Sequence, residues 1–172
     1  MKNVSLTREE LDTLLRVALK YSEVDFLMFS VTFNHGLRVS ETLSLTKANF
    51  VDGHLMIQRL KGSEKTAQRL LDSERLGLES LAVAWAGEKM FRMHRTTFWR
   101  KMQQYGAEAG IPSYKCHPHA FKHTCGRLAF KAGLTVPEVA SILGHKSVGN
   151  AVIYGMPEPQ EAYAAFAKAV GQ

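Results

Sequence analysis

The sequence has few of the residues that cross-link or interrupt a chain, with two cysteines and five prolines among 172 residues. Two cysteines, Cys116 and Cys125, cannot build a disulfide framework, which excludes a cysteine-stapled secreted domain. No apolar run reaches the roughly 18 residues of a membrane span, and the N-terminus lacks the apolar core of a signal peptide. These absences predict a reduced, cytoplasmic protein with no membrane partner.

A large excess of charge of one sign is also missing. Lys and Arg total 22 against 16 Asp and Glu, which gives a net charge of +6. With 45% hydrophobic and 22% charged residues, the composition is globular and excludes collagen-like, low-complexity and acidic disordered chains. The moderate positive charge is compatible with a polyanionic partner but does not require one.

Helical spacing of apolar residues dominates the chain, and strand signals are confined to its middle. Capping-box pairs at Thr7/Glu10 and Thr135/Glu138 each precede an amphipathic run. Further helices are predicted over residues 24–34, 40–45, 73–86, 96–109, 119–132 and 160–170. Residues 49–51, 54–60 and 66–71, separated by turns at 52–53 and 61–64, read as successive strands. The predicted fold class is therefore mainly α with a small three-stranded antiparallel β-sheet.

Two motifs place cationic side chains at helix ends. Arg38 follows the helix-stopping Gly36, and Glu41 lies three residues further on, so the carboxylate can steady an outward guanidinium. An ordinary surface ion pair is the other interpretation of that motif. His119, Lys122 and His123 share one helix face. A zinc site there is disfavoured, because a lysine repels a cation and no second ligand cluster exists, so no metal is predicted.

Two single residues complete the set of candidates. His145 lies in a corner after Gly144, and Tyr154 follows nine residues later. Taken alone, they read as a histidine packed in a turn and a core tyrosine. A tyrosine can, however, act as a covalent nucleophile when its proton is removed and the developing anion is stabilised.

Together these residues fit cleavage of a phosphodiester. Without a metal, that chemistry needs several cations around the non-bridging oxygens, an in-line nucleophile and an acid for the leaving oxygen. Tyr154 is the candidate nucleophile, and Lys61, at the hairpin tip, is the candidate acid, with Lys65 as the other lysine there. The candidate phosphate-binding groups are Arg38, His119, Lys122 and His145.

Five sequence elements occur in an order that points to one family. They are HGLRVSETLSL with Arg38, RLKGSEK with Lys61, HAFKHT with His119, LGHKS with His145, and Tyr154 nine residues later. In these elements the chain resembles the catalytic domain of the tyrosine recombinase (phage integrase) family. One element departs from the family pattern: Lys122 stands where an arginine is usual and lacks the planar fork that binds two phosphate oxygens.

The resemblance implies site-specific DNA recombination through a covalent 3′-phosphotyrosyl intermediate. Tyr154 would attack, Lys61 would protonate the leaving 5′ oxygen, and the four phosphate-binding groups would neutralise the phosphate. No metal or nucleotide cofactor is implied. The implied partners are double-stranded DNA and further copies of the chain, as a tetramer in synapsis and a monomer when free. The implied location is the bacterial cytoplasm or a phage-infected host.

Residues 1–172 are interpreted as one catalytic domain. Residues 157–172 are expected to form a C-terminal tail helix after a linker that contains Pro157 and Pro159. The N-terminal DNA-clamping domain usual in the family is expected to be absent. Two other functions remain open: type IB topoisomerase-like nicking and resealing, and a DNA-binding accessory protein with a degraded site, which Lys122 favours. Candidate phosphate contacts outside the site are Lys47, Arg59, Arg92, Arg95, Arg100 and Lys101.

Overall fold

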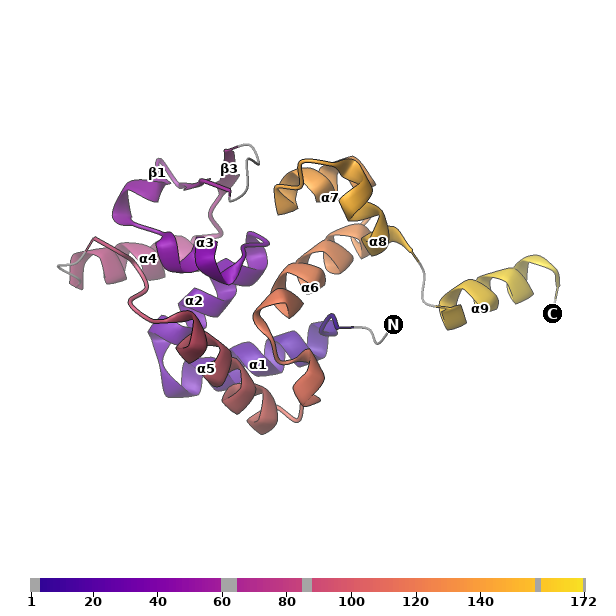
Figure 1. Ribbon diagram of the computed structural model, residues 1–172, viewed down its shortest axis with the longest axis horizontal. Helices are drawn as coiled ribbons and strands as arrows, with labels where there is room; N and C mark the ends of the chain where they lie inside the picture. Colours follow the sequence, from indigo (N-terminus) through magenta and orange to yellow (C-terminus); the bar gives the residue numbers. More distant parts are fainter. Residues whose placement is uncertain (1–3, 60–64, 85–87, 157–158, 172) are drawn as a thin grey trace.

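The computed structural model describes residues 4–59, 65–84, 88–156 and 159–171, with residues 159–161 described by their backbone alone. Helices dominate the molecule, and the described strands form one small sheet (Figure 1). The predicted fold class is confirmed. In chain order the elements are α1 (Arg8–Tyr21), α2 (Glu23–Asn34), α3 (Val39–Ser44), η1 (Lys47–Asn49), β1 (Phe50–Val51), β2 (His54–Ile57), β3 (Thr66–Arg69), α4 (Asp72–Ala84), α5 (Arg95–Glu108), η2 (Ser113–Lys115), α6 (Pro118–Lys131), α7 (Val136–Leu143), η3 (Val148–Ala151), α8 (Val152–Gly155) and α9 (Pro159–Ala169).

Local signals start and stop the helices as the sequence predicts. The Thr7 amide donates to Glu10 Oε2 at 2.7 Å, and the Glu10 amide donates to Thr7 Oγ1 at 3.1 Å, so both halves of the first capping box are present. Helix α7 has the second capping box and ends at Gly144, whose φ of +60° is the left-handed conformation that glycine adopts without strain. Each cap satisfies backbone groups that a helix end leaves unpaired.

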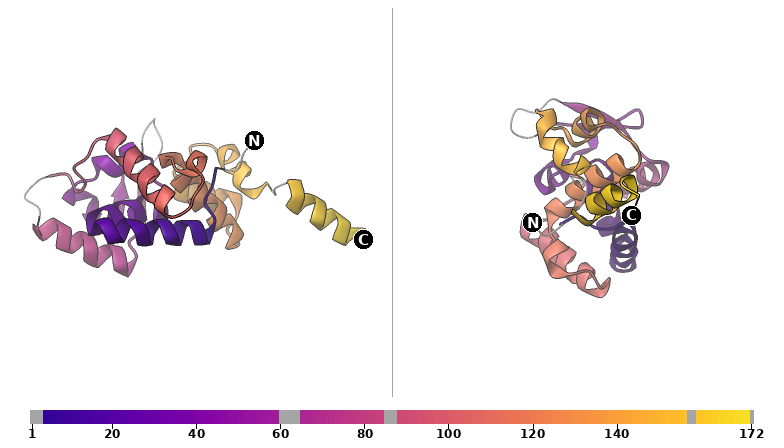
Figure 2. Two further views of the ribbon diagram at one scale, coloured as in Figure 1. Left: turned by 90° about the horizontal axis from the view of Figure 1, so that it is seen from below. Right: turned by 90° about the vertical axis from the view of Figure 1, so that its right-hand side faces the viewer.

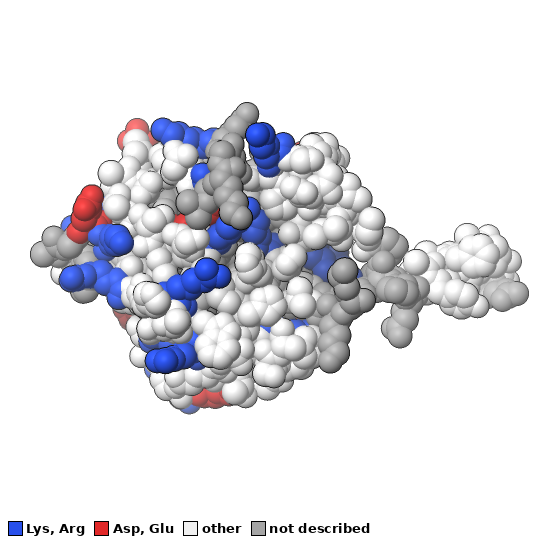
Figure 3. Space-filling model, viewed as in Figure 1, with Lys and Arg blue, Asp and Glu red and all other residues white. Residues whose placement is uncertain are grey.

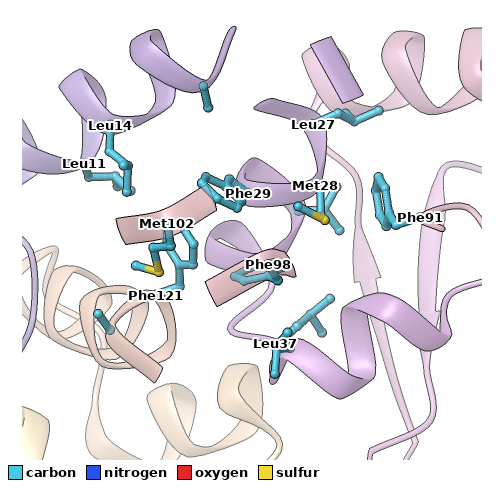
Figure 4. Close-up of a cluster of buried hydrophobic side chains, with 14 of the residues drawn as sticks. Leu11, Leu14, Leu27, Met28, Phe29, Leu37, Phe91, Phe98, Met102 and Phe121 are labelled. Atoms are coloured by element: carbon cyan, nitrogen blue, oxygen red, sulfur yellow. The ribbon is translucent and has the colours of Figure 1, made fainter. Parts of the chain in front are cut away.

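The main core joins α2 to α5 and α6. The ring centroid of Phe29 on α2 lies 5.0 Å from that of Phe98 on α5 and 5.2 Å from that of Phe121 on α6. Figure 4 shows these rings in the same cluster as Leu37, which immediately precedes Arg38. Each fully buried aromatic side chain contributes about 1.5–3 kcal/mol through removal from water. The core thus fixes the turn after α2 relative to α6.

A smaller cluster joins α6, α7 and α8. It is built from Val139, Ala140 and Leu143 of α7, with Cys125 of α6 and Tyr154 of α8. Both cysteines of the chain are free and buried. Burial raises the pKa of the Cys116 thiol and raises that of Cys125 to about 11. The candidate nucleophile therefore belongs to a packed cluster rather than to a loop.

The sheet is antiparallel in the order β1-β2-β3, with His54 opposite Arg69 and Ile57 opposite Thr66. Asp52 and Gly53 both have positive φ, as a two-residue hairpin turn of type I′ requires. The predicted hairpin is confirmed, with strands shorter than expected. Residues 60–64, which include Lys61, lie outside the described residues.

Helix α9 lies apart from the other helices (Figure 1 and Figure 2, left). The predicted linker was wrong at Pro159, which is the first residue of α9; proline suits that position because no amide hydrogen is needed there. Pro157 lies outside the described residues. Tyr163 and Phe166 form an apolar stripe on α9 and are 71% and 62% exposed, so this stripe is uncovered in this chain alone.

A helix that crosses a bilayer needs about 20 mostly apolar residues. Among the described ranges, no helix combines that length with that apolar character.

Candidate active site

Arg38 is held at the start of α3 by a buried carboxylate. Its Nη1 donates to Glu41 Oε1 at 2.9 Å, and its backbone amide donates to Glu41 Oε2 at 2.8 Å. The Glu41 side chain is 1% exposed and that of Arg38 is 28% exposed. The predicted arrangement is confirmed, and the alternative of an ordinary surface pair is wrong because the carboxylate is buried.

The turn before Arg38 packs closely on α7. Gly36 has a φ of +55°, and a Cβ there would lie only 2.4 Å from Leu143 Cδ2. A left-handed backbone and a lack of space therefore both require glycine at this position. The contact brings the Arg38 turn against the end of α7, one residue before Gly144 and two before His145.

Lys122 lies between these two segments. Its Nζ donates to the carbonyl oxygens of Gly36 at 3.1 Å and Leu143 at 2.6 Å, and the residue is buried. Burial, followed by the charges of Arg38 and Arg59, lowers the pKa of Lys122 to about 7. At neutral pH the protein is therefore poised to gain or lose a proton here.

The histidines of α6 have different surroundings from Lys122. His119 is exposed, and its pKa is lowered first by partial desolvation and then by the charge of Arg38. His123 is half-buried on the side of the helix that meets Tyr154, with its ring centroid 5.8 Å from that of the tyrosine. Across the described residues, no group of three or more His, Cys, Asp or Glu side chains is placed to hold a metal ion.

His145 enters the same region from the end of α7. Its Nδ1 is a buried atom without a hydrogen-bond partner in the described part of the chain. Burial, followed by Lys122 and Arg38, lowers the pKa of His145 to about 4, so its imidazole is uncharged at neutral pH. An uncharged imidazole can accept a hydrogen bond at one nitrogen and donate one at the other.

Tyr154 packs directly on the backbone of α6. It is 7% exposed, and a Cβ added to Gly126 would lie 2.9 Å from both Cδ1 and Cδ2 of its ring. The ring stacks on that of His145, with centroids 6.1 Å apart. Burial raises the pKa of Tyr154 to about 12, with Cys125 raising it further and Arg38 opposing the shift. The hydroxyl is therefore protonated at neutral pH.

The structure thus gathers five of the six predicted site residues, with Lys122 bonded to the segments before Arg38 and His145. The sixth, Lys61, lies outside the described residues; Lys65 is exposed beside β3. The face in Figure 3 carries basic side chains across its middle, with most of the acidic ones near its edges.

One predicted phosphate contact was wrong. Arg59 is 2% exposed and directs its guanidinium into the protein, so it cannot reach a DNA phosphate. The sequence could have predicted that Arg59 faces inward, because Leu55 and Ile57 face inward and residue 59 continues that alternation. Lys101 stays a prediction, because its Nζ lies 2.5 Å from Asp25 Oδ2 but its side chain is 30% exposed.

Comparison with known proteins decides the family, because the phage integrase family model matches residues 5–161. The chain belongs to that family. The tyrosine recombinase XerA of Thermococcus onnurineus is 28% identical over 164 residues, covering 87% of this chain and 57% of that protein. The type 1 fimbriae regulatory protein FimE of Escherichia coli K12 is 28% identical over 145 residues, covering 76% of this chain and 73% of that protein. The chain thus spans little more than half the length of the XerA relative.

Solved structures confirm the fold. A crystal structure of XerA recombinase matches all of this chain and 67% of that chain, with a TM-score of 0.80 and 22% identity. The catalytic domain of bacteriophage HP1 integrase matches 94% of this chain and 92% of that one, with a TM-score of 0.71 and 17% identity. The predicted tyrosine recombinase catalytic-domain fold is therefore confirmed.

Proposed function

We propose that this phage integrase family member carries out site-specific DNA recombination, cleaving and rejoining strands through a covalent 3′-phosphotyrosyl intermediate. The proposal is carried by one arrangement of side chains. Tyr154 packs on His145, and Lys122 donates both to the turn before Arg38 and to the end of α7 before His145. The relatives support it, since the XerA proteins are named tyrosine recombinases and one solved relative is XerH bound to its difH substrate. No comparison favours a topoisomerase or an accessory protein.

Electrostatics suit the site to a phosphodiester. Arg38, Arg59 and Lys122 surround a single carboxylate, Glu41. The scissile phosphate would supply the missing negative charge, and Arg38 is the most exposed of the three cations. Preorganised cations of this kind stabilise the charge that develops in the transition state.

The proposed reaction exchanges one phosphate ester for another. The Tyr154 oxygen forms a bond to phosphorus while the bond from phosphorus to the 5′ oxygen breaks. Tyr154 gives its proton to solvent water, and Lys61 donates a proton to the leaving oxygen. Because one ester replaces another, the bond energy is kept in the phosphotyrosine, and attack by a 5′ hydroxyl reverses the step without a cofactor.

Covalent capture tests this function without a defined target sequence. The probe is a pool of duplexes with a randomised core and a nick on each strand, so that cleavage releases a short fragment and traps the protein on the DNA. After denaturation and nuclease digestion, mass spectrometry should find nucleotides on the peptide that contains Tyr154. Binding of the pool with no adduct after repeated selection would favour the accessory protein instead.

The selected duplex also separates recombination from topoisomerase activity. A recombinase should join strands of two differently labelled copies of the duplex. Relaxation of supercoiled plasmid without any strand exchange would favour the type IB topoisomerase-like function.

We expect the affinity for DNA to depend strongly on salt. Lysines and arginines that neutralise phosphates release counterions, so log affinity should fall linearly with log salt at a slope of about −0.9 per phosphate contacted. Titration of a fluorescent duplex between low and physiological salt measures the slope. An affinity that does not change with salt would contradict any function on DNA.

We further propose that copies of the chain assemble on DNA as a tetramer, with α9 of one copy docking on its neighbour. Tyr163 and Phe166 give α9 an uncovered apolar stripe, and a helix this short is marginal alone in water. Truncation after Pro159 should therefore impair assembly on DNA more than it lowers the melting temperature. Light scattering of the DNA complex and thermal melting measure the two effects.

A matched variant shows whether the loss of any exposed apolar side chain would impair assembly. Val83→Ser removes an 89% exposed apolar side chain from α4 and should leave assembly unchanged. A truncated protein that melts much lower, yet assembles fully where it is folded, would show that α9 serves only its own chain.

A further inference from the structure

Arg59 is a charged side chain placed fully inside the protein. Its side chain is 0% exposed, and it follows β2 on the inward-facing side of the strand. Burial lowers its pKa, as expected for a cation removed from water. Burial of a guanidinium destabilises the fold unless its donors are paired, so the hydrogen bonds of Arg59 explain how the fold tolerates it.

The hydrogen bonds of Arg59 match its five N–H groups one for one. Nη1 donates to Gly36 O and Glu41 Oε2, both at 3.3 Å. Nη2 donates to His35 O at 3.1 Å and to Ile142 O at 2.6 Å. Nε donates to Thr66 Oγ1 at 3.3 Å. One side chain therefore joins the end of α2, α3, β3 and the end of α7.

The residues that accept hydrogen bonds from Arg59 either bind a candidate catalytic group or lie close to one in the chain. Glu41 uses its other oxygen to hold Arg38, and Gly36 O lies two residues before Arg38. Ile142 O lies three residues before His145, and the next carbonyl, that of Leu143, accepts from Lys122. Cations on the last carbonyls of α7 also suit the negative end of the helix dipole.

The backbone at Gly144, the residue before His145, packs directly against the Arg59 side chain. A Cβ added to Gly144 would lie 2.5 Å from Arg59 Nε and 2.7 Å from Arg59 Cδ. The space above Gly144 is thus filled by arginine rather than by solvent. Arg59 contacts this corner both through a hydrogen bond to α7 and through direct packing.

We propose that Arg59 is a positioning residue, which sets the spacing between Arg38 and His145 while making no contact with DNA itself. The proposal rests on the proposed function, in which both of those groups hold the scissile phosphate. A lysine at position 59 would keep the charge but lose the planar fork that spans α2, α3 and α7 at once. Charge alone would then fail to preserve the geometry.

The test compares Arg59→Lys with Arg75→Lys, a matched change at an exposed arginine that pairs with Glu79 on α4. On the duplex selected by covalent capture, Arg59→Lys should slow single-turnover cleavage by at least about tenfold, as loss of a supporting contact does in other preorganised sites. Affinity measured in a Tyr154→Phe background should change less than about twofold, since only transition-state interactions are lost. Arg75→Lys should change neither quantity.

A double-mutant cycle separates positioning from a general structural role. If Arg59 acts through His145, Arg59→Lys should have less effect on cleavage in a His145→Ala background than in the wild type. The same loss in both backgrounds would overturn the proposal.

A measurement that needs no cleavage distinguishes failure of this proposal from failure of the proposed function. In ¹⁵N-histidine spectra, the His145 signals should move in Arg59→Lys and stay in place in Arg75→Lys, even if the wild type forms no adduct. Should Arg59→Lys not fold, Thr66→Val removes one of the five hydrogen bonds and should produce a smaller shift of the same signals. Unmoved His145 signals in the folded variant would overturn the proposal.

Discussion

Replacing Tyr154 with phenylalanine should abolish the covalent adduct with DNA. The change removes one hydroxyl and leaves the ring on Gly126, so the melting temperature and the DNA affinity should stay close to the wild type. Because no other atom of the ring can form the phosphotyrosyl bond, the expected loss is complete rather than partial. Gel analysis of denatured protein bound to the selected duplex measures it.

Tyr163→Phe is the matched control, because Tyr163 is the next tyrosine along the chain and is exposed on α9. It should form the adduct at the wild-type rate. An adduct in Tyr154→Phe would remove Tyr154 from the mechanism, and its absence in Tyr163→Phe would place the nucleophile in the tail.

Replacing Lys122 with alanine should lower cleavage about 100-fold below pH 7, as loss of one transition-state donor does elsewhere. The effect should shrink as the pH rises. Below the pKa of about 7 the wild-type lysine is charged and can offset phosphate charge. Above that pKa the wild type loses the charge, so its rate should fall toward that of the alanine variant.

Second-order cleavage rates between pH 6 and 9 test this dependence, because at low substrate concentration the midpoint reports the free protein. Lys122→Arg stays charged and should lack the fall. Three neighbouring groups titrate outside this window, with pKa values of about 4 for His145, 11 for Cys125 and 12 for Tyr154. A flat wild-type profile, with Lys122→Ala equally fast, would exclude Lys122 from the chemistry.

Local sequence relations predicted much of the fold and part of the site. Both capping boxes and the Arg38–Glu41 pair join residues three apart, and the Asp52-Gly53 turn joins neighbours, so residue types and spacing determine them. The order of motifs then indicated which separate segments the fold would bring together.

Long-range contacts could not be predicted in the same way. The two carbonyls that bind Lys122 lie 86 and 21 residues away in sequence, and nothing near Lys122 indicates them. Strand alternation indicates that Arg59 faces inward, but the sequence does not indicate its partners, which come from four separate segments. Pro159 read as a helix interruption because sequence alone does not distinguish a first helical residue from a linker.

The two buried thiols have a practical consequence for following α9 in solution. Maleimides react with thiolates, and burial with a raised pKa keeps the thiolate of Cys116 and Cys125 scarce. Dyes can therefore be attached to introduced cysteines while both native ones are retained. Val83→Cys on α4 and Lys168→Cys on α9 use exposed positions, and energy transfer between the two dyes would track the tail helix as DNA is added.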